Sequence, residues 1–206
     1  MDDPRQRAPS VARNRDPILE VLRRVLPERG LALEVASGSG EHAVYFAERL
    51  PHLEFLPSDP DEAARRSIAA WIDASGLSNV LAPIALDAAT PHWLVEKADA
   101  IICINMAHIS PWSATEGLFK GAGRLLGSGA PLYLYGPYKR GGAHTAESNQ
   151  AFDDWLRGRN SEWALRDFER VTECAVLNGL SEPQVVEMPA NNLSLIFRRR
   201  GPRGDP

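Results

Sequence analysis

Short continuous apolar runs alternate along the chain with longer stretches in which apolar residues recur every three or four positions. The continuous runs predict strands at residues 31–36, 51–59, 80–86, 98–104 and 132–135. The periodic stretches predict helices at 43–50, 61–75, 111–126, 149–156 and 167–177. Two last runs, 184–188 and 193–198, predict an antiparallel hairpin. The alternation predicts an α/β fold in which helices cover both faces of an open, mostly parallel sheet.

The N-terminal residues predict a late start for the first helix. Residues 1–15 are largely polar, whereas Asp16 followed by Pro17 is typical of an N-cap and a first helical position. We therefore expect a helix from Pro17 to Leu26, and a segment 1–15 that is flexible or covers a bound cofactor. The run at 98–104 is nearly all apolar, so we expect that strand to be buried on both faces.

Length and composition limit the classes of protein that this chain can represent. With 206 residues, 44% apolar and 24% charged, it has the size and composition of one globular domain, which we expect to span residues 1–206. The net charge of −4 gives no electrostatic case for nucleic acid, because phosphate binding needs clustered lysine and arginine. The short basic runs, such as Arg198 to Arg200, are read as solvated surface.

No apolar run approaches the roughly 18 residues of a membrane span, and the N-terminus lacks the apolar core of a signal peptide. Cys103 and Cys174 have no metal-type spacing and are interpreted as reduced thiols, so we expect no metal. We therefore expect a cytoplasmic protein, a monomer or homodimer, whose partner is a small molecule and neither nucleic acid nor membrane.

Acidic and glycine residues follow the first three predicted strands. Gly38 and Gly40 come directly after the first run, Asp59 ends the second, and Asp87 ends the third. Ligands of open α/β sheets bind at these carboxyl ends. Gly40 precedes Asp59 by about 20 residues, the distance at which a carboxylate reaches a nucleoside ribose and accepts from both hydroxyls. We expect Asp87 to meet the adenine edge.

A tight turn without any ligand also explains two glycines, but three successive strands that end in an acid favour a binding site. A nicotinamide dinucleotide prefers a third glycine where this chain has Ala43, and its pyrophosphate would be repelled by Glu41 at the helix start. A cationic ligand without phosphate fits the pattern better.

The segment Glu34 to Gly40 resembles the first motif of class I S-adenosylmethionine-dependent methyltransferases, in which an acid ends the strand before a glycine turn. Ala36 departs from that motif, where many members have glycine. The chain is similar over almost its whole length to a family of predicted methyltransferases of unknown substrate from bacteria and animals. The matching segments are Arg13–Arg15, Pro17–Leu19, Ser37–His42, Pro57–Asp59, Asn105–Ile109, Tyr135–Tyr138 and Pro189–Leu193.

This resemblance implies a three-layer sandwich with seven strands in the order 3-2-1-4-5-7-6, the last antiparallel. It also implies S-adenosylmethionine as the cofactor and S-adenosylhomocysteine as the product. The cofactor-binding residues it implies are Glu34, Ala36, Ser37, Gly38, Gly40, His42, Asp59, Pro60, Asp87, Ala88 and Asn105. His42 is expected at the methionine end, although a histidine on a helix surface explains it equally well.

The acceptor side is expected in the loops after the fourth and fifth strands. The catalytic candidates there are His108, Tyr138 and Asn105, and further lining candidates are Tyr135, His144, Asn149, Asn191 and Asn192. His108 is either a general base or a hydrogen-bonded structural histidine. Tyr135 and Tyr138 are candidates for an aromatic wall beside a sulfonium, and core packing explains Tyr135 as well. Gly141 and Gly142 are either the hinge of a lid or an ordinary flexible loop.

The leading hypothesis is methyl transfer from S-adenosylmethionine to a small molecule by in-line displacement, with positioning as the main catalytic device and no metal. The alternative is a regulatory protein that binds S-adenosylmethionine or S-adenosylhomocysteine without turnover, because Asn105–His108 is not a recognisable catalytic tetrapeptide. An NAD-dependent oxidoreductase is disfavoured by Glu41 and Ala43.

Overall fold

The computed structural model describes residues 3–201, and six of its strands form one central sheet in the order β2-β1-β3-β4-β8-β7. The strands are β1 Gly30–Val35, β2 Leu53–Ser58, β3 Ala100–Ile104, β4 Pro131–Gly136, β7 Gln184–Met188 and β8 Asn192–Arg198. The strands from β2 to β4 are parallel, whereas β8 is antiparallel to both of its neighbours. The α/β class, the mostly parallel sheet and the closing hairpin are thereby confirmed.

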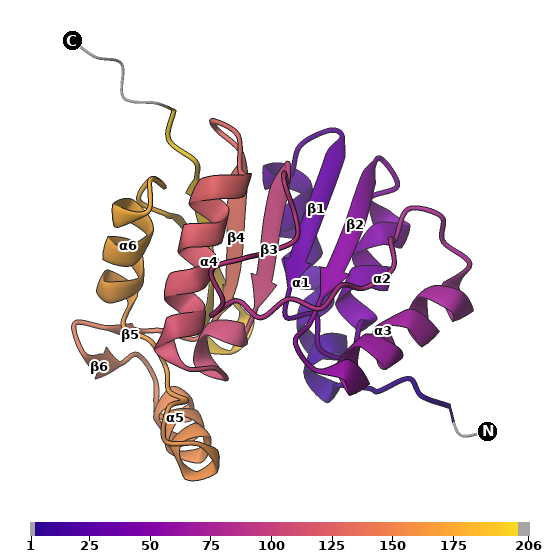
Figure 1. Cartoon of the computed structure of the whole chain (residues 1–206). Helices are drawn as coiled ribbons and strands as arrows, with labels where there is room; N and C mark the ends of the chain where they lie inside the picture. The colour runs from indigo at the N-terminus through magenta and orange to yellow at the C-terminus, as the bar shows by residue number, and fades with distance from the viewer. Residues whose placement is uncertain (1–2, 202–206) are drawn as a thin grey trace.

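Helices cover both faces of this sheet, as Figure 1 shows. On one face lie α1 Pro9–Val25 and α2 Glu41–Arg49, with α3 Glu62–Ser75 beside α2. On the other face lie α4 Trp112–Leu125 and α6 Phe168–Leu177. Helix α3 begins and ends where the sequence predicts, with Asp61 as N-cap and Gly76 in the left-handed conformation after the last turn. The result is the predicted three-layer sandwich.

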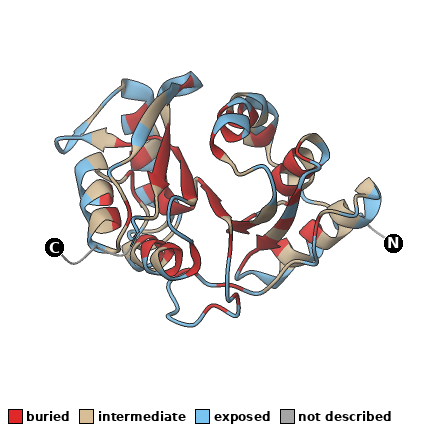
Figure 2. Ribbon diagram, turned by 90° about the horizontal axis from the view of Figure 1, so that it is seen from above, coloured by how far each residue is buried: buried red, intermediate tan, exposed pale blue. Residues whose placement is uncertain are grey.

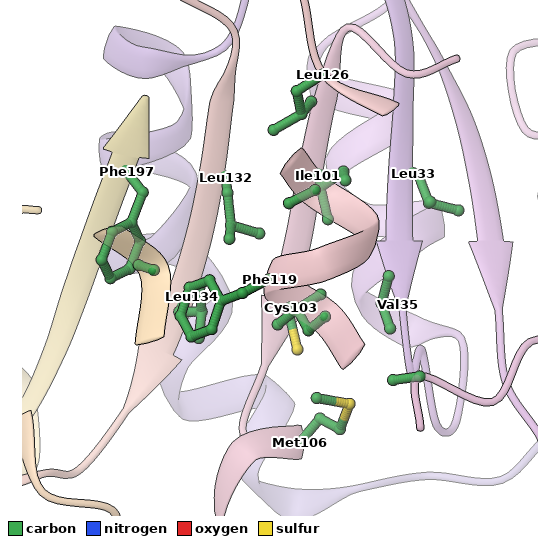
Figure 3. Close-up of a cluster of buried hydrophobic side chains, with 14 of the residues drawn as sticks. Leu33, Val35, Ile101, Cys103, Met106, Phe119, Leu126, Leu132, Leu134 and Phe197 are labelled. Carbon is green, nitrogen blue, oxygen red and sulfur yellow. The ribbon is translucent and has the colours of Figure 1, made fainter. Parts of the chain in front are cut away.

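The core follows from the alternation of side chains along the strands. Leu33 and Val35 of β1 point to the α4 side, where they join Ile101, Leu132 and Phe119 (Figure 3). The intervening side chains of the same strands pack against α1 and α2. All five residues of β3 are buried, which confirms the expectation that this strand is covered on both faces. Buried positions accordingly concentrate in the sheet and on the helix sides toward it (Figure 2).

The prediction of a continuous strand at 80–86 is wrong, although the segment lies where that strand was expected, beside β2. Only two isolated parallel bridges, Phe55 to Val80 and Ser58 to Ile84, join this segment to the edge of β2. Pro83 lies between the two bridges and has no N–H to donate to a ladder, so a continuous strand cannot form. The sheet therefore has six strands instead of seven, although the segment occupies the edge that the predicted strand order assigns to it.

The predicted helix start at Pro17 is also wrong. Helix α1 begins at Pro9, and Pro17 lies inside it. Pro9 supplies the first helical position instead, and Val11 and Asn14 bury the face that the extra turns present to the protein. Because Pro17 has no N–H, it cannot donate to the carbonyl of Arg13 as a helical residue normally would.

The segment before α1 is tied to its neighbours and is not a loose tail. The backbone N–H of Gln6 donates to Ser67 Oγ over 2.8 Å, and Trp71 Nε1 donates to the Gln6 carbonyl over 2.9 Å. The N–H of Ala8 donates to a carboxylate oxygen of Glu41 over 2.7 Å. The described part of the segment therefore runs along α3 and the start of α2.

The chain between β4 and α6 adds a small hairpin and a helix at the carboxyl end of the sheet. The hairpin strands are β5 Lys139–Arg140 and β6 Ala143–His144, where the sequence predicted only a loop, and α5 Glu147–Arg159 follows. Helix α5 lies below the strand ends in Figure 1. Asp153 fixes it, because Oδ1 accepts from the N–H of Leu165 over 2.6 Å and Oδ2 lies 2.9 Å from Nε2 of His144. In the described part of the chain, no helix is long and apolar enough to cross a bilayer.

Candidate functional site

The turn after β1 is built from three residues with positive φ. Ala36 has φ 58°, Gly38 has φ 57° and Gly40 has φ 89°. A Cβ on Gly40 would lie 2.7 Å from Cα of Ile68, so the glycine allows α3 to approach the turn. A Cβ on Gly38 would meet nothing within 4 Å. Ala36 adopts the left-handed geometry in which glycine is unstrained, and the turn forms in spite of this departure from the motif.

Serines and an aspartate fasten this turn to the end of β2. Ser58 Oγ donates to the carbonyl of Glu34 over 2.7 Å, and the N–H of Ser37 donates to the carbonyl of Ser58 over 2.8 Å. The N–H of Gly38 donates to Oδ2 of Asp59 over 2.9 Å. These bonds hold the glycine turn and the Asp59 carboxylate in one rigid unit.

A first cavity of about 450 Å³ opens beside this unit, a volume typical of small-molecule sites. Its lining residues are Val35, Ala36, Gly38, Asp59, Pro60, Leu86, Asp87, Ala88, Ala89, Met106, Ile109, Ser110, Pro111, Ala114 and Trp163. Asp59 and Asp87 are the charged members, and none of these described lining residues is a lysine, arginine or histidine. The first cavity therefore favours a ligand with positive charge.

Glu34 lies buried behind the same turn, only 2% exposed. Its pKa is raised to about 7, chiefly by burial; a hydrogen bond from Ser37 opposes the rise, and the nearby Asp59 charge adds to it. Among the described residues its Oε2 atom has no hydrogen-bond partner. A third carboxyl group thus backs the first cavity.

A second cavity of about 590 Å³ lies on the other side of the segment 105–110. Its lining residues are Ser10, Arg13, Asn14, Pro17, Asn105, Ile109, Tyr135, Pro137, Ser148, Asn149, Phe152, Trp155, Pro189, Ala190 and Asn192. They come from α1, from α5, from the end of β4 and from the turn between β7 and β8. Within this described lining Arg13 is the one charged side chain at neutral pH.

Ile109 lines both cavities and is the wall that they share. The wall begins at Asn105, which has φ 63° and turns the chain away from β3. Arg166 clamps it from outside, since Nε donates to the Ala107 carbonyl over 2.7 Å and Nη2 donates to the Ser110 carbonyl over 2.5 Å. Two sites of opposite charge are therefore held at one fixed partition.

The sequence-predicted cofactor residues divide into three groups. Six of them line the first cavity: Ala36, Gly38, Asp59, Pro60, Asp87 and Ala88. Four support the turn from behind or beside it and line neither cavity: Glu34, Ser37, Gly40 and His42. Asn105 lines the second cavity, next to Met106 of the first.

The acceptor-side candidates are divided as well. Asn105, Tyr135, Asn149 and Asn192 line the second cavity, whereas His108, Tyr138, His144 and Asn191 line neither. His108 is fully buried, and its Nδ1 accepts from the N–H of Arg166 over 3.4 Å. Burial and the Arg166 charge lower its pKa to about 3, which makes it a weak base. The ring of Tyr138 packs edge-on against it at 4.9 Å, and burial raises the pKa of that phenol.

His42 links two helices instead of facing a cavity. Its Nε2–H donates to Oδ1 of Asn14 over 2.9 Å, and its ring stacks on Phe46. Burial, together with the Arg15 charge, lowers its pKa to about 4, so the imidazole is neutral.

Several lining residues were not predicted, above all Arg13, Phe152 and Trp155. The signal for Arg13 was present in the sequence, because Ser10, Arg13, Asn14 and Pro17 follow the i, i+3, i+4, i+7 spacing of one helix face. It was hidden by the expectation that the helix begins at Pro17. No group of three or more histidine, cysteine, aspartate or glutamate side chains within residues 3–201 is placed to hold a metal ion.

The strand order, the glycine turn and the acids at the strand ends are those of the class I methyltransferase fold. The family model described as "Protein of unknown function (DUF938)" matches residues 5–199, and the chain belongs to this family.

Solved structures share the fold, and two of them are methyltransferases by name. The S-adenosylmethionine-dependent methyltransferase SibL superposes with a TM-score of 0.76 at 15% identity, over 93% of this chain and 56% of that one. An O-methyltransferase family protein from Burkholderia thailandensis gives 0.77 at 17% identity, over 95% of this chain and 58% of that one. The chain thus spans little more than half the length of these two proteins. The YcgJ protein from Bacillus subtilis gives 0.71 at 11% identity, over 93% of this chain and 100% of that one.

Proposed function

We propose that the protein transfers a methyl group from S-adenosylmethionine to a small-molecule acceptor. The observation that carries the proposal is the pair of cavities that meet at Ile109, one lined by carboxylates and the other by an arginine. A donor site and an acceptor site must adjoin for the two reacting atoms to come within near-attack distance.

The first cavity fits the chemistry of this cofactor. S-adenosylmethionine carries a sulfonium and an ammonium cation and no phosphate, which suits a lining that holds Asp59 and Asp87 and no cationic side chain in the part of the chain described. The open space in front of Gly38 allows a ligand to lie against the backbone there. A dinucleotide would bring a pyrophosphate to the same carboxylates and be repelled.

Asp59 would hold the ribose. Oδ2 of Asp59 already accepts from Gly38 and Oδ1 from the N–H of Asp61, so the carboxylate is oriented before any ligand arrives. Each oxygen retains a lone pair for a ribose hydroxyl. Asp87 would meet the adenine edge, with Ala88 and Leu86 as the apolar surface beneath the base.

S-adenosylmethionine supplies, when bound, an electrophilic methyl group that is displaced from sulfur in line by a lone pair of the acceptor. The contribution of the chain is positioning, and the Arg166 clamp on the segment 105–110 keeps the partition between the cavities fixed. His108 acts through that clamp, because its Nδ1 accepts from the N–H of Arg166. Its low pKa suits this structural role better than proton abstraction.

The proposal is tested by thermal shift with S-adenosylmethionine, S-adenosylhomocysteine and NAD at matched concentrations. We expect stabilisation by the two adenosyl compounds and none by NAD. Asp59→Ala should abolish the shift, whereas Asp73→Ala, an exposed carboxylate on α3, should leave it unchanged. Stabilisation by NAD alone would refute the methyltransferase interpretation.

Turnover separates an enzyme from a regulatory protein that only binds the cofactor. Incubation with S-adenosylmethionine labelled on the methyl group and a cell-free metabolite pool should give a labelled small molecule. A protein that shows the thermal shift and yields no labelled product would be a binding protein instead.

A further inference from the structure

We propose that the second cavity binds acceptors that combine a flat aromatic body with a carboxylate, and that Arg13 is the anchor for that carboxylate. That the bound molecule is a methyl acceptor rests on the proposed function. The anion-binding site itself is inferred from the second cavity alone.

The charge of the second cavity is one-sided. Arg13 lines it, and within residues 3–201 no carboxylate forms an ion pair with this guanidinium. No aspartate or glutamate occurs among the described lining residues. An anionic group is therefore the complement that the cavity lacks.

Hydrogen-bond donors converge on the same place. The Oδ1 atom of Asn14 is engaged by His42, which leaves its amide N–H groups for the hydroxyl oxygen of Tyr135. Burial raises the pKa of Tyr135, while that hydrogen bond and the Arg13 charge act against the rise. Tyr135 lines the second cavity, so its hydroxyl can donate to a ligand there. The amide of Asn105 adds a further donor, whereas the amide of Asn192 is engaged by the carbonyls of Pro189 and Ala190.

The opposite wall is aromatic. Phe152 and Trp155 lie one turn apart on α5, with their rings stacked at 5.7 Å between centroids and 20° between planes. Trp155 is 49% exposed, although a tryptophan normally buries most of its surface. Pro17, Pro137 and Pro189 complete the apolar lining. The guanidinium of Arg159 lies over the Trp155 ring, 4.2 Å from its centroid, and Phe152 stacks on the same ring. A planar ring in this space would therefore pack against the exposed edges of Trp155 and Phe152.

The geometry favours a carboxylate over a phosphate. The planar fork of one guanidinium matches the two oxygens of a carboxylate. A dianionic phosphate would call for a second cation, and the described lining offers no lysine and no other arginine. A single negative charge on a planar group is the better match.

Calorimetric titration with matched acid and amide pairs tests this inference: benzoate against benzamide, and 1-naphthoate against 1-naphthamide. The members of each pair have nearly the same shape and differ in charge. We expect each acid to bind about tenfold more tightly than its amide, the difference that one charge-assisted hydrogen bond supplies. Naphthoate should bind more tightly than benzoate because its larger ring system buries more apolar surface in the cavity.

Arg13→Gln should remove the preference for the acids while leaving the amides unchanged, and Arg13→Lys should retain part of it. Arg24→Gln is the matched control, because Arg24 is an exposed arginine of the same helix about 16 Å further along its axis. Acids that bind no better than amides, or not at all up to about 10 mM, would overturn the inference, as would a preference that survives in Arg13→Gln.

The two proposals fail separately. If the acid preference depends on Arg13 but S-adenosylmethionine gives no thermal shift, the anion site stands and the methyltransferase assignment falls. If S-adenosylmethionine binds and the acids show no preference, the cofactor site stands and the acceptor class is wrong.

Discussion

The two cavities share one wall and differ in nearly everything else. The first lies against the ends of β1 and β2 and carries Asp59 and Asp87, with buried Glu34 behind it. The second lies between α1, α5 and the β7–β8 turn and carries Arg13. The partition between them is a short segment around Ile109, held by backbone contacts to Arg166.

This difference shows how one fold can keep a cofactor site constant while the acceptor site varies. The parallel strands bring the acids of the first cavity together wherever this topology occurs, so a cofactor site follows from the sheet. The second cavity depends on a helix that precedes the sheet and on one inserted after β4. These helices lie outside the parallel strands, and we expect them to determine which acceptor is bound.

The largest expected effect concerns the acidity of the first cavity. The pKa of Glu34 is raised to about 7 from an ordinary value of 4.5, so the native state holds a proton that the unfolded state releases between those values. The contribution of Glu34 to stability should therefore fall as pH rises through this window. Relative to Glu34→Gln, wild type should lose about 2 kcal/mol of unfolding free energy between pH 5 and pH 8.

Urea unfolding at several pH values measures this difference. The pKa values of His42 and His108 are lowered, so their contributions to the stability of the protein increase as pH rises. This opposite trend is the same in wild type and Glu34→Gln, and the comparison cancels it. Glu54→Gln, at an exposed position of β2, is the control and should follow wild type. Parallel curves for wild type and Glu34→Gln would show that no raised carboxyl pKa backs the first cavity.

A charge placed on the shared wall should act on the two cavities in opposite directions. Ile109→Lys should weaken binding of S-adenosylmethionine and strengthen binding of naphthoate, each by about fivefold, and Ile109→Glu should do the reverse. Ile109 is 43% exposed, so either charge can be accommodated without burial. The same substitutions at Leu177, which is 78% exposed on α6, are the controls. Shifts of the same sign in both cavities would disprove the difference in charge.

A smaller effect should be confined to the second cavity. Tyr135→Phe removes one neutral donor, so naphthoate should bind about threefold more weakly while S-adenosylmethionine is unaffected. Tyr45→Phe on α2 makes the same chemical change outside both cavities, at a hydroxyl that donates to Asp16. Calorimetry on both variants makes the comparison. An equal loss for the two ligands would mean that Tyr135 supports the fold and not the acceptor.

The first cavity was accessible from the sequence because its residues sit at fixed places in a repeating pattern. Each strand is marked by an apolar run, and the residue that follows the run lines the first cavity, as Asp59 and Asp87 do. The error in this region was local. Pro83 breaks the ladder beside β2 without moving the segment, so the site residues kept their positions.

The second cavity was not accessible in the same way, because helix packing decides it. Residues such as Arg13 and Trp155 are far apart in the chain and meet only when α1 and α5 have docked. The start of α1 was predicted at Pro17 because proline is favoured at a first helical position. In the structure the burial of Val11 and Asn14 extends the helix back to Pro9. His108 and Tyr138 followed the right strands, but their side chains turned into the core.

The most direct test of the account is a crossed titration. S-adenosylmethionine and 1-naphthoate are each titrated by calorimetry into Asp59→Asn and Arg13→Gln. We predict that Asp59→Asn binds S-adenosylmethionine about 30-fold more weakly and naphthoate as wild type does. Arg13→Gln should bind naphthoate about tenfold more weakly and S-adenosylmethionine as wild type does. Both ligands weakened by the same variant, or neither by its assigned one, would contradict two adjoining sites of opposite charge.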